Sequence, residues 1–206
     1  MKKLVDLSHE IRTDMPVYPG DRKVNLEKDR DLEKDEYTNH NLSMGMHVGT
    51  HIDLPMHMIN SNYAVSDLSL NKLSGPAKLI YAKGERVIEY KSIYEELIKK
   101  DDIVIFYTGF AEKFNSEEYY HDHPLISRGL AEFLAEKEIN ILAFDMPSPD
   151  KSPYEIHKIL FEKDILILEN LCNLDKLIGF KEFKLLIFPL KVKTSGAPVR
   201  VAAEIS

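Results

Sequence analysis

A single cysteine, Cys172, excludes an internal disulfide bond and lies in no Cys-x-x-Cys motif, so we interpret it as structural. No apolar run approaches the roughly 20 residues of a membrane-spanning helix, and the charged start of the chain is followed by only two apolar residues. Lysine and arginine form no cluster long enough to follow a phosphate backbone, and the net charge is -7. These absences predict a soluble, cytoplasmic protein that binds neither membranes nor nucleic acid.

The 206 residues, of which 44% are hydrophobic and 30% charged, are enough to bury a substantial core, and we expect one domain over 1–206. Short β-like runs alternate along the chain with helical patterns, which indicates an α/β layer architecture. The strand candidates are residues 79–83, 103–107, 141–145, 165–169 and 185–190. Residues 21–36 are strongly charged with little apolar periodicity, which predicts a solvated excursion or a lid.

Two helix starts are indicated by capping boxes. Ser92 is followed three residues later by Glu95, and Ser152 is followed by a proline and then by Glu155. Between these two starts, residues 127–138 carry apolar side chains at helical spacing, which predicts a helix with one face packed on the sheet.

Residues 47–57, His-Val-Gly-Thr-His-Ile-Asp-Leu-Pro-Met-His, concentrate four metal-binding or proton-transferring side chains in eleven positions. His47, His51 and Asp53 are spaced by even numbers of residues, so on an extended strand their side chains leave from one face. On a helix, Asp53 would lie roughly 200° from His51 and could not join the histidines. Imidazole and carboxylate are the usual ligands of zinc and neighbouring metals. The segment therefore predicts a metal site on a strand, in preference to two satisfied histidines beside a half-buried strand.

A straight strand would separate His47 from His51 by roughly 13 Å of backbone, which is awkward for two ligands of one ion. Gly49 lies between them and can accommodate a bulge or an unusual backbone dihedral. We therefore predict a kink at Gly49 that draws the two imidazoles together.

Three ligands leave a metal, or a pair of metals, short of protein donors. His157, in the helix expected to begin at Ser152, and Glu169, at the end of an apolar strand, are the best candidates for the missing ligands. Each residue taken alone is also compatible with packing or solvent exposure.

The sequence resembles the cyclase family, which includes bacterial kynurenine formamidase and isatin hydrolase. The family signature His-x-Gly-Thr-His-x-Asp-x-Pro-x-His matches residues 47–57 at every fixed position. The resemblance extends over nearly the whole chain. It includes Asp6-Leu7-Ser8, Tyr18-Pro19-Gly20-Asp21, the turn at residues 145–150, Pro189-Leu190 and Ala197-Pro198-Val199-Arg200.

The resemblance implies a single-domain α/β fold of the swivelling β/α/β type, with a mixed central sheet, flanking helices and assembly into a homodimer or homotetramer. It also implies two divalent ions per subunit, zinc or manganese. His47, His51 and Asp53 would bind the first ion, and Asp53, His157 and Glu169 the second. The resemblance also implies that Asp53 and Glu169 are the shared carboxylates.

The implied activity is hydrolysis of a small aryl amide, as in kynurenine formamidase, with His57 as proton donor and acceptor. Tyr18 is expected at the substrate, where the formamidases have a tryptophan; this sequence has no tryptophan. Tyrosine can still stack on a ring. Hydrolysis of a cyclic amide such as isatin, or of a lactone or ester, is an alternative, and a non-catalytic metal-binding module is a second one.

Other positions carry less specific expectations. Phe110 and the loop around Tyr63 are candidates for the walls of the substrate pocket. Arg200 either closes the pocket against a carboxylate or pairs with an acid at a subunit contact. The remaining histidines lack partners at ligand spacing and are not expected in the site; they are His9, His40, His121 and His123.

Overall fold

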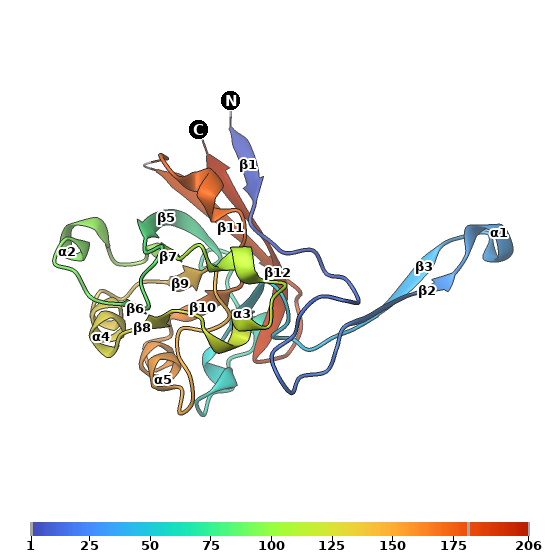
Figure 1. Ribbon diagram of the computed structural model, residues 1–206, viewed down its shortest axis with the longest axis horizontal. Helices are drawn as coiled ribbons and strands as arrows, with labels where there is room; N and C mark the ends of the chain where they lie inside the picture. The colour runs from blue at the N-terminus through green and yellow to red at the C-terminus, as the bar shows by residue number, and fades with distance from the viewer. Residues whose placement is uncertain (1, 181, 206) are drawn as a thin grey trace.

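Eight strands form a mixed sheet that makes up the body of the molecule (Figure 1). The computed structural model describes residues 2–180 and 182–205. The strands are β1 (Lys3–Asp6), β4 (His51–Asp53), β5 (Ser74–Tyr81), β7 (Ile103–Tyr107), β9 (Ile141–Phe144), β10 (Leu166–Glu169), β11 (Phe183–Pro189) and β12 (Gly196–Ile205). Their order is β1-β12-β11-β5-β7-β9-β10-β4, and β4 also pairs with β12, so the sheet closes like a barrel. The pairs β5–β7, β7–β9 and β9–β10 are parallel, and the other pairs are antiparallel.

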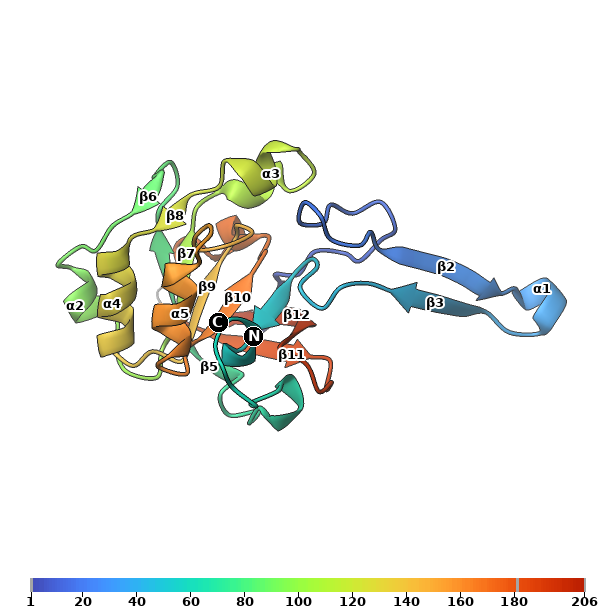
Figure 2. The same ribbon diagram turned by 90° about the horizontal axis from the view of Figure 1, so that it is seen from below.

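The helices are short and lie outside the sheet. They are α1 (Leu32–Asp35), α2 (Tyr94–Leu97), α3 (Glu118–His121), α4 (Arg128–Glu136) and α5 (Glu155–Phe161). Figure 2 shows α4 and α5 side by side against the parallel strands. A two-stranded ladder, β6 (Val87–Ile88) with β8 (Leu125–Ile126), lies beside them. The predicted helix at 127–138 is confirmed as α4, and its apolar residues are buried.

The central parallel strands are buried on both faces, which explains their unbroken apolar sequences. In β7, Ile103 and Ile105 point into the closed sheet, whereas Val104 and Phe106 pack under the helices. The strand prediction for 103–107 matches β7, and those for 141–145, 165–169 and 185–190 match β9, β10 and β11 within two residues at each end. The strand expected at 79–83 is displaced, because β5 covers residues 74–81.

The charged segment forms an arm that projects from the body of the molecule (Figures 1 and 2). It consists of β2 (Asn25–Arg30), α1 and β3 (Asn39–Ser43), which pair as an antiparallel ribbon. Almost all of its residues are exposed. The expected solvated excursion is confirmed, but its two strands lack the apolar alternation by which strands are predicted.

The two predicted capping boxes are wrong. The helix expected from Ser92 is the single turn α2, and no side chain caps its first residues. The helix α5 begins after Ser152, and its free N–H groups are bound by Asp150 instead: the Ile156 N–H donates to Asp150 Oδ2 at 2.6 Å. The carboxylate of Asp150 therefore caps the helix in place of the Ser152 hydroxyl.

The predicted α/β fold with a mixed central sheet and flanking helices is confirmed. None of the helices in the described part of the chain is long and apolar enough to cross a membrane.

Candidate metal centre and active site

The short strand β4 carries His51 and Asp53 on one face. Between them, Ile52 is fully buried in the apolar interior, as the predicted alternation requires. In the neighbouring strand β10, Glu169 lies opposite His51 in the register. Three buried polar side chains therefore meet where β4 and β10 pair.

His47 joins these residues from a turn that precedes β4, and not from the strand itself. The strand predicted over 47–53 is restricted to residues 51–53. Gly49 has a φ of +67°, which bends the chain so that the rings of His47 and His51 lie 5.4 Å apart. The predicted kink at Gly49 is confirmed. Gly196 of β12 is a second requirement, because a Cβ atom there would lie 2.4 Å from His47 Cε1.

Donor atoms converge in two groups of three that share Asp53. His47, His51 and Asp53 form one group; Asp53, His157 and Glu169 form the other. In each group the three donor atoms lie within 4.8 Å of one another. These are the two ligand sets that the family resemblance implied. Their geometry is compatible with metal binding, and the binding itself stays a prediction.

Hydrogen bonds on the outer ring nitrogens orient two of these histidines. His51 Nδ1 lies 2.8 Å from the Gly49 carbonyl oxygen, and His157 Nδ1 lies 2.6 Å from Asp150 Oδ1. Because a carbonyl or carboxylate oxygen only accepts, each Nδ1 is the donor. The Nε2 atoms therefore face the cluster, and His51 Nε2 lies 3.3 Å from both Asp53 and Glu169.

The two carboxylates of the cluster stabilise positive charge on the imidazoles. Burial alone would lower the pKa of His157, but Asp150 and Glu169 outweigh burial and raise its pKa to about 9. The pKa of His51 is raised well above its ordinary value because Asp53 and Glu169 likewise outweigh burial. Burial would raise the pKa of Asp53, yet the neighbouring histidines hold it well below its ordinary range.

The carboxylate of Glu169 shows whether the cluster suits a cation. Glu169 Oε1 is buried and has no hydrogen-bond partner among the described residues. His157 Nε2 is its neighbour at 3.6 Å, which is too long for a hydrogen bond. A buried carboxylate oxygen without a partner is unfavourable, and a divalent ion at this point would satisfy it. The donor set therefore fits a metal.

His57 stands over the cluster without belonging to either ligand group. It ends a single 3-10 turn, Pro55–His57, that follows β4 directly. Its ring stacks on that of His47 with centroids 3.9 Å apart, and lies 6.4 Å from the ring of His157. Burial is the largest influence on His57 and lowers its pKa, which favours the neutral imidazole.

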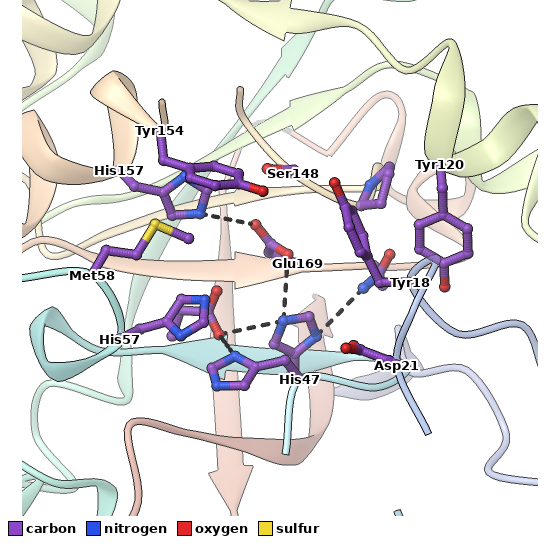
Figure 3. Close-up of a pocket in the computed structure, with 14 residues that line it drawn as sticks. Tyr18, Asp21, His47, His57, Met58, Tyr120, Ser148, Tyr154, His157 and Glu169 are labelled. Carbon is purple, nitrogen blue, oxygen red and sulfur yellow. Dashed lines mark hydrogen bonds and ion pairs between the residues drawn. The ribbon is translucent and has the colours of Figure 1, made fainter. Parts of the chain in front are cut away.

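The cluster opens into a pocket of about 340 Å³ (Figure 3). Tyr18 lines it as predicted, but Phe110 and Tyr63 do not. Phe110 stacks behind the pocket on the ring of Tyr119, and Tyr63 packs against the apolar interior of the sheet. The wall residues that the sequence did not indicate are Met58, Tyr120, Tyr154 and Asn170.

Arg200 contributes nothing to the pocket. Its guanidinium binds both carboxylate oxygens of Asp6, at 2.9 and 2.7 Å, across the pair β1–β12. The expectation that Arg200 closes the pocket is therefore wrong, and its alternative, a pair with an acid at a subunit contact, stays a prediction. As expected, the four remaining histidines lie outside both ligand groups within residues 2–180 and 182–205.

Comparison with known proteins assigns the family. A family model described as "Putative cyclase" matches residues 5–151. The kynurenine formamidase of Bacillus cereus (strain ATCC 10987 / NRS 248) is 30% identical over 201 residues, which cover 95% of this chain and 94% of that protein. The chain belongs to the cyclase family. The kynurenine formamidase of Bacillus anthracis is likewise 30% identical, over 203 residues that cover 96% of this cyclase-family chain and 95% of that protein.

Solved structures agree with this assignment. One described as a potential metal-dependent hydrolase with cyclase activity has a TM-score of 0.84 and 26% identity, and the match covers 100% of this chain and 99% of that one. Isatin hydrolase A from Labrenzia aggregata has a TM-score of 0.89 and 24% identity, with 99% and 94% covered, and supports the fold alone. The cyclase-family fold thus extends over the whole described chain.

Proposed function

We propose that this protein is a metal-dependent hydrolase that cleaves the carbon–nitrogen bond of a small aryl amide, with an aryl formamide as the first substrate to test. The observation that carries the proposal is the convergence of two ligand groups on Asp53 beside the unpartnered oxygen of Glu169. The relatives named kynurenine formamidase support the amide bond as the target.

In this proposal His47, His51 and Asp53 would hold one divalent ion, and Asp53, His157 and Glu169 a second, as zinc or manganese. Divalent ions in such sites make water acidic near neutral pH and polarise a carbonyl group. The protein's part is to fix the donors. Asp150 and the Gly49 carbonyl hold the rings of His157 and His51, respectively, with Nε2 toward the cluster.

His57 is proposed as the proton donor and acceptor. Its imidazole lies beside the cluster, is partly buried and belongs to neither ligand group. A neutral imidazole there can accept a proton from water during attack on the carbonyl, and can then donate it to the leaving nitrogen. A storage or sensor site has no use for such a group, which argues against a non-catalytic metal-binding module.

Three tyrosines favour an aromatic substrate. Tyr18, Tyr120 and Tyr154 line the pocket, and a volume of about 340 Å³ lies at the small end of the range for ligand pockets. Tyr18 is thus proposed to contact the substrate ring. A cyclic amide such as isatin, or a lactone or ester, would use the same metal ligands and the same base.

The deciding experiment is an assay of metal-stripped protein reloaded with zinc or manganese, with N-formylkynurenine, isatin and a simple aryl ester in parallel. We expect metal-dependent cleavage of the formamide. Cleavage of isatin or of the ester alone would change the assigned substrate and leave the proposed metal-dependent hydrolysis in place. Tight metal binding without any turnover would favour the binding module.

The role of His57 is tested in the same assay with His57→Gln. Loss of a general acid–base lowers kcat by about 10²-fold or more, whereas the metal content should stay that of the wild type. His40→Gln, on the exposed arm, is the matched control. Wild-type turnover in His57→Gln would remove His57 from the mechanism, and loss of metal would make it a ligand.

We also propose that the protein assembles into a homodimer or homotetramer, as the family resemblance implies. The arm supports this proposal, because it exposes apolar side chains and has no core of its own. A cytoplasmic location, expected from the sequence, stays a prediction.

A further inference from the structure

A second cavity, of about 310 Å³, lies at the carboxyl ends of the parallel strands β7, β9 and β10. It shares no lining residue with the candidate active site. Its walls are the end of β7 with the turn after it, Asp145 directly after β9, and residues 172–175 after β10. In α/β sheets, ligands usually bind at this edge of the parallel strands. The fold therefore provides a place for a second ligand.

The deepest acid of this cavity has one carboxylate oxygen that makes no hydrogen bond. Asp145 is only 1% exposed, and its Oδ1 accepts from the N–H of Thr108 at 2.8 Å and from the Thr108 hydroxyl at 2.6 Å. Its Oδ2 is buried and has no hydrogen-bond partner among the described residues. Burial raises the pKa of the Asp145 carboxyl, and the donors of Thr108 oppose that effect only in part. A buried oxygen of this kind is unfavourable unless a donor reaches it.

The charge of the cavity favours a cation. Asp145, Glu112 and Asp175 line it, whereas none of its lining residues in the described part of the chain is a lysine or arginine. Glu112 is neutralised by Lys83, whose Nζ lies 2.6 Å from Glu112 Oε1. Asp175 is exposed and takes part in no ion pair within residues 2–180 and 182–205. Two carboxylates of the cavity therefore lack a counter-charge, and they would repel an anionic ligand.

The arrangement of donors favours an organic ammonium group over a directly coordinated metal ion. Among the described residues, three histidine, cysteine or carboxylate donors come within metal-binding distance only in the two groups that share Asp53. An ammonium group instead carries three N–H donors and needs single acceptors in different directions. The cavity volume is at the small end of the range for ligand pockets, which suits a small amine.

We infer that this cavity binds a primary alkylammonium group, with Asp145 Oδ2 as its buried acceptor and Asp175 as the exposed second carboxylate. The inference goes beyond the proposed hydrolysis and does not depend on it, because the cavity and the metal centre have no lining residue in common.

Nuclear magnetic resonance titration of the zinc-loaded protein with propylammonium tests the site, with the amide signals of Gly109 and Asn173 as reporters. We expect saturable shifts of both signals. Trimethylpropylammonium has the same charge without an N–H donor, and we expect it to bind roughly tenfold more weakly, because it cannot reach Asp145 Oδ2 with a hydrogen bond. Equal affinity for the two cations, or no saturable shift of the reporters, would overturn the inference.

Two variants test the two carboxylates. Asp145→Asn can keep the acceptor for Thr108 and place an NH₂ group where Oδ2 was, so we expect propylammonium to bind roughly tenfold more weakly or worse. Its amide spectrum shows whether it folds. Asp175→Asn changes an exposed side chain, and we expect a loss of about threefold. Glu89→Gln removes an exposed acid outside the cavity and should bind like the wild type. Wild-type affinity in Asp175→Asn and in folded Asp145→Asn would overturn the inference.

A free amine and a lysine side chain of a second copy of this chain both carry the proposed group. Sedimentation equilibrium with and without saturating propylammonium distinguishes these two sources. A fall in mass would assign the ammonium group to a lysine of a second copy, which the amine displaces. An unchanged mass, together with the saturable shifts, would assign it to a free amine.

Discussion

At the scale of single residues, Asn170 connects the fold to the candidate metal centre. Its side-chain N–H donates at 2.9 Å to the Gly49 carbonyl, the same oxygen that accepts from His51 Nδ1. Its side-chain oxygen accepts from the Tyr119 hydroxyl at 2.7 Å. Tyr119 is fully buried, so this chain of hydrogen bonds is shielded from water. Tyr119 therefore orients His51 through two intermediates without touching the site.

The substitution Tyr119→Phe removes only the hydroxyl and leaves the oxygen of Asn170 without its donor. We expect the free energy of unfolding to fall by about 1–2 kcal/mol, because a buried acceptor loses its partner. We also expect zinc affinity to fall roughly tenfold, because outer hydrogen bonds fix the ligand ring. Denaturant unfolding and competition with a chelator measure the two effects.

Tyr94→Phe is the matched control. The hydroxyl of Tyr94 is also buried but makes no hydrogen bond to the described residues, and the residue packs in the core under the helices. We expect it to leave zinc affinity unchanged. If Tyr119→Phe binds zinc as the wild type does, Tyr119 supports the core and not His51.

Sequence patterns indicated the residues whose donor atoms converge and missed the residues that support them. His51 and Asp53 could be predicted because even spacing on a strand is a local property, and His47 because Gly49 indicated a kink. The strand position of Glu169 was visible in the apolar run before it. Tyr120 and Asn170 have no such spacing, because tertiary contacts bring them to the site. The direct succession of Glu169 and Asn170 is the one signal that could have indicated the latter.

At the scale of elements, the arm is more exposed than an isolated two-stranded ribbon can be and still be stable. Within residues 2–180 and 182–205, the strands β2 and β3 pair only with each other, and α1 buries no residue. Two-stranded ribbons without a packed face are marginally stable in water. Leu32, Tyr37 and Leu42 are exposed by 64%, 55% and 47%. We propose that a second copy of the chain covers these side chains, in line with the assembly that the family resemblance implies.

We predict that the protein sediments as a dimer or tetramer, and that the combined substitution of Leu32, Tyr37 and Leu42 by serine shifts it toward the monomer of 23.7 kDa. Removing apolar contacts weakens an interface while leaving the core of each chain intact. Leu70→Ser, at a side chain that is 70% exposed outside the arm, is the control and should keep the wild-type mass. A monomeric wild type in sedimentation equilibrium would contradict the prediction.

The ends of an element could be predicted from the local sequence where both of its faces are buried. They could not be predicted where a side chain from outside the element binds its end. The strand β7 could be predicted to the residue because both of its faces are buried. The start of α5 could not, because Asp150 bonds simultaneously to the helix N-terminus and to His157. Residues 152–155 have the residue types of a capping box, but the carboxylate of Asp150, upstream of Ser152, is a stronger acceptor.

At the scale of the whole molecule, closure of the sheet joins segments that no local pattern connects. The pairing of Gly196 with Asp53 links β12 to β4 across most of the sequence. It also brings a glycine against His47, where any side chain would collide. The pocket is therefore a product of the closed sheet. Phe110 and Tyr63 were wrongly predicted to line it because tertiary contacts decide its walls, whereas the convergence of the donor residues could be predicted.

At the same scale, we expect the acid stability of the fold to depend on His9, a partly buried histidine of the N-terminal segment. The ring of His9 stacks on Phe114 at a centroid distance of 3.6 Å, and its Nε2 is buried without a partner among the described residues. Burial, with a smaller effect of Arg12, lowers the pKa of His9 to about 4. The unfolded chain, with an ordinary pKa of about 6.5, binds the proton more readily than the folded one. Stability is therefore lost as pH falls from about 6.5 toward 4.

The substitution His9→Phe keeps a stacked ring and removes the titrating group, so it should reduce acid sensitivity. Between pH 7.5 and pH 5, the proton on His9 accounts for about 2 kcal/mol of lost unfolding free energy in the wild type. We expect the decrease measured by denaturant titration of the metal-free protein to be smaller by that amount in His9→Phe, since all other titrating groups are common to both proteins. His40→Phe, at an exposed position of the arm, should decrease like the wild type. An identical decrease in His9→Phe and wild type would mean that His9 takes up its proton as easily in the folded chain as in the unfolded one.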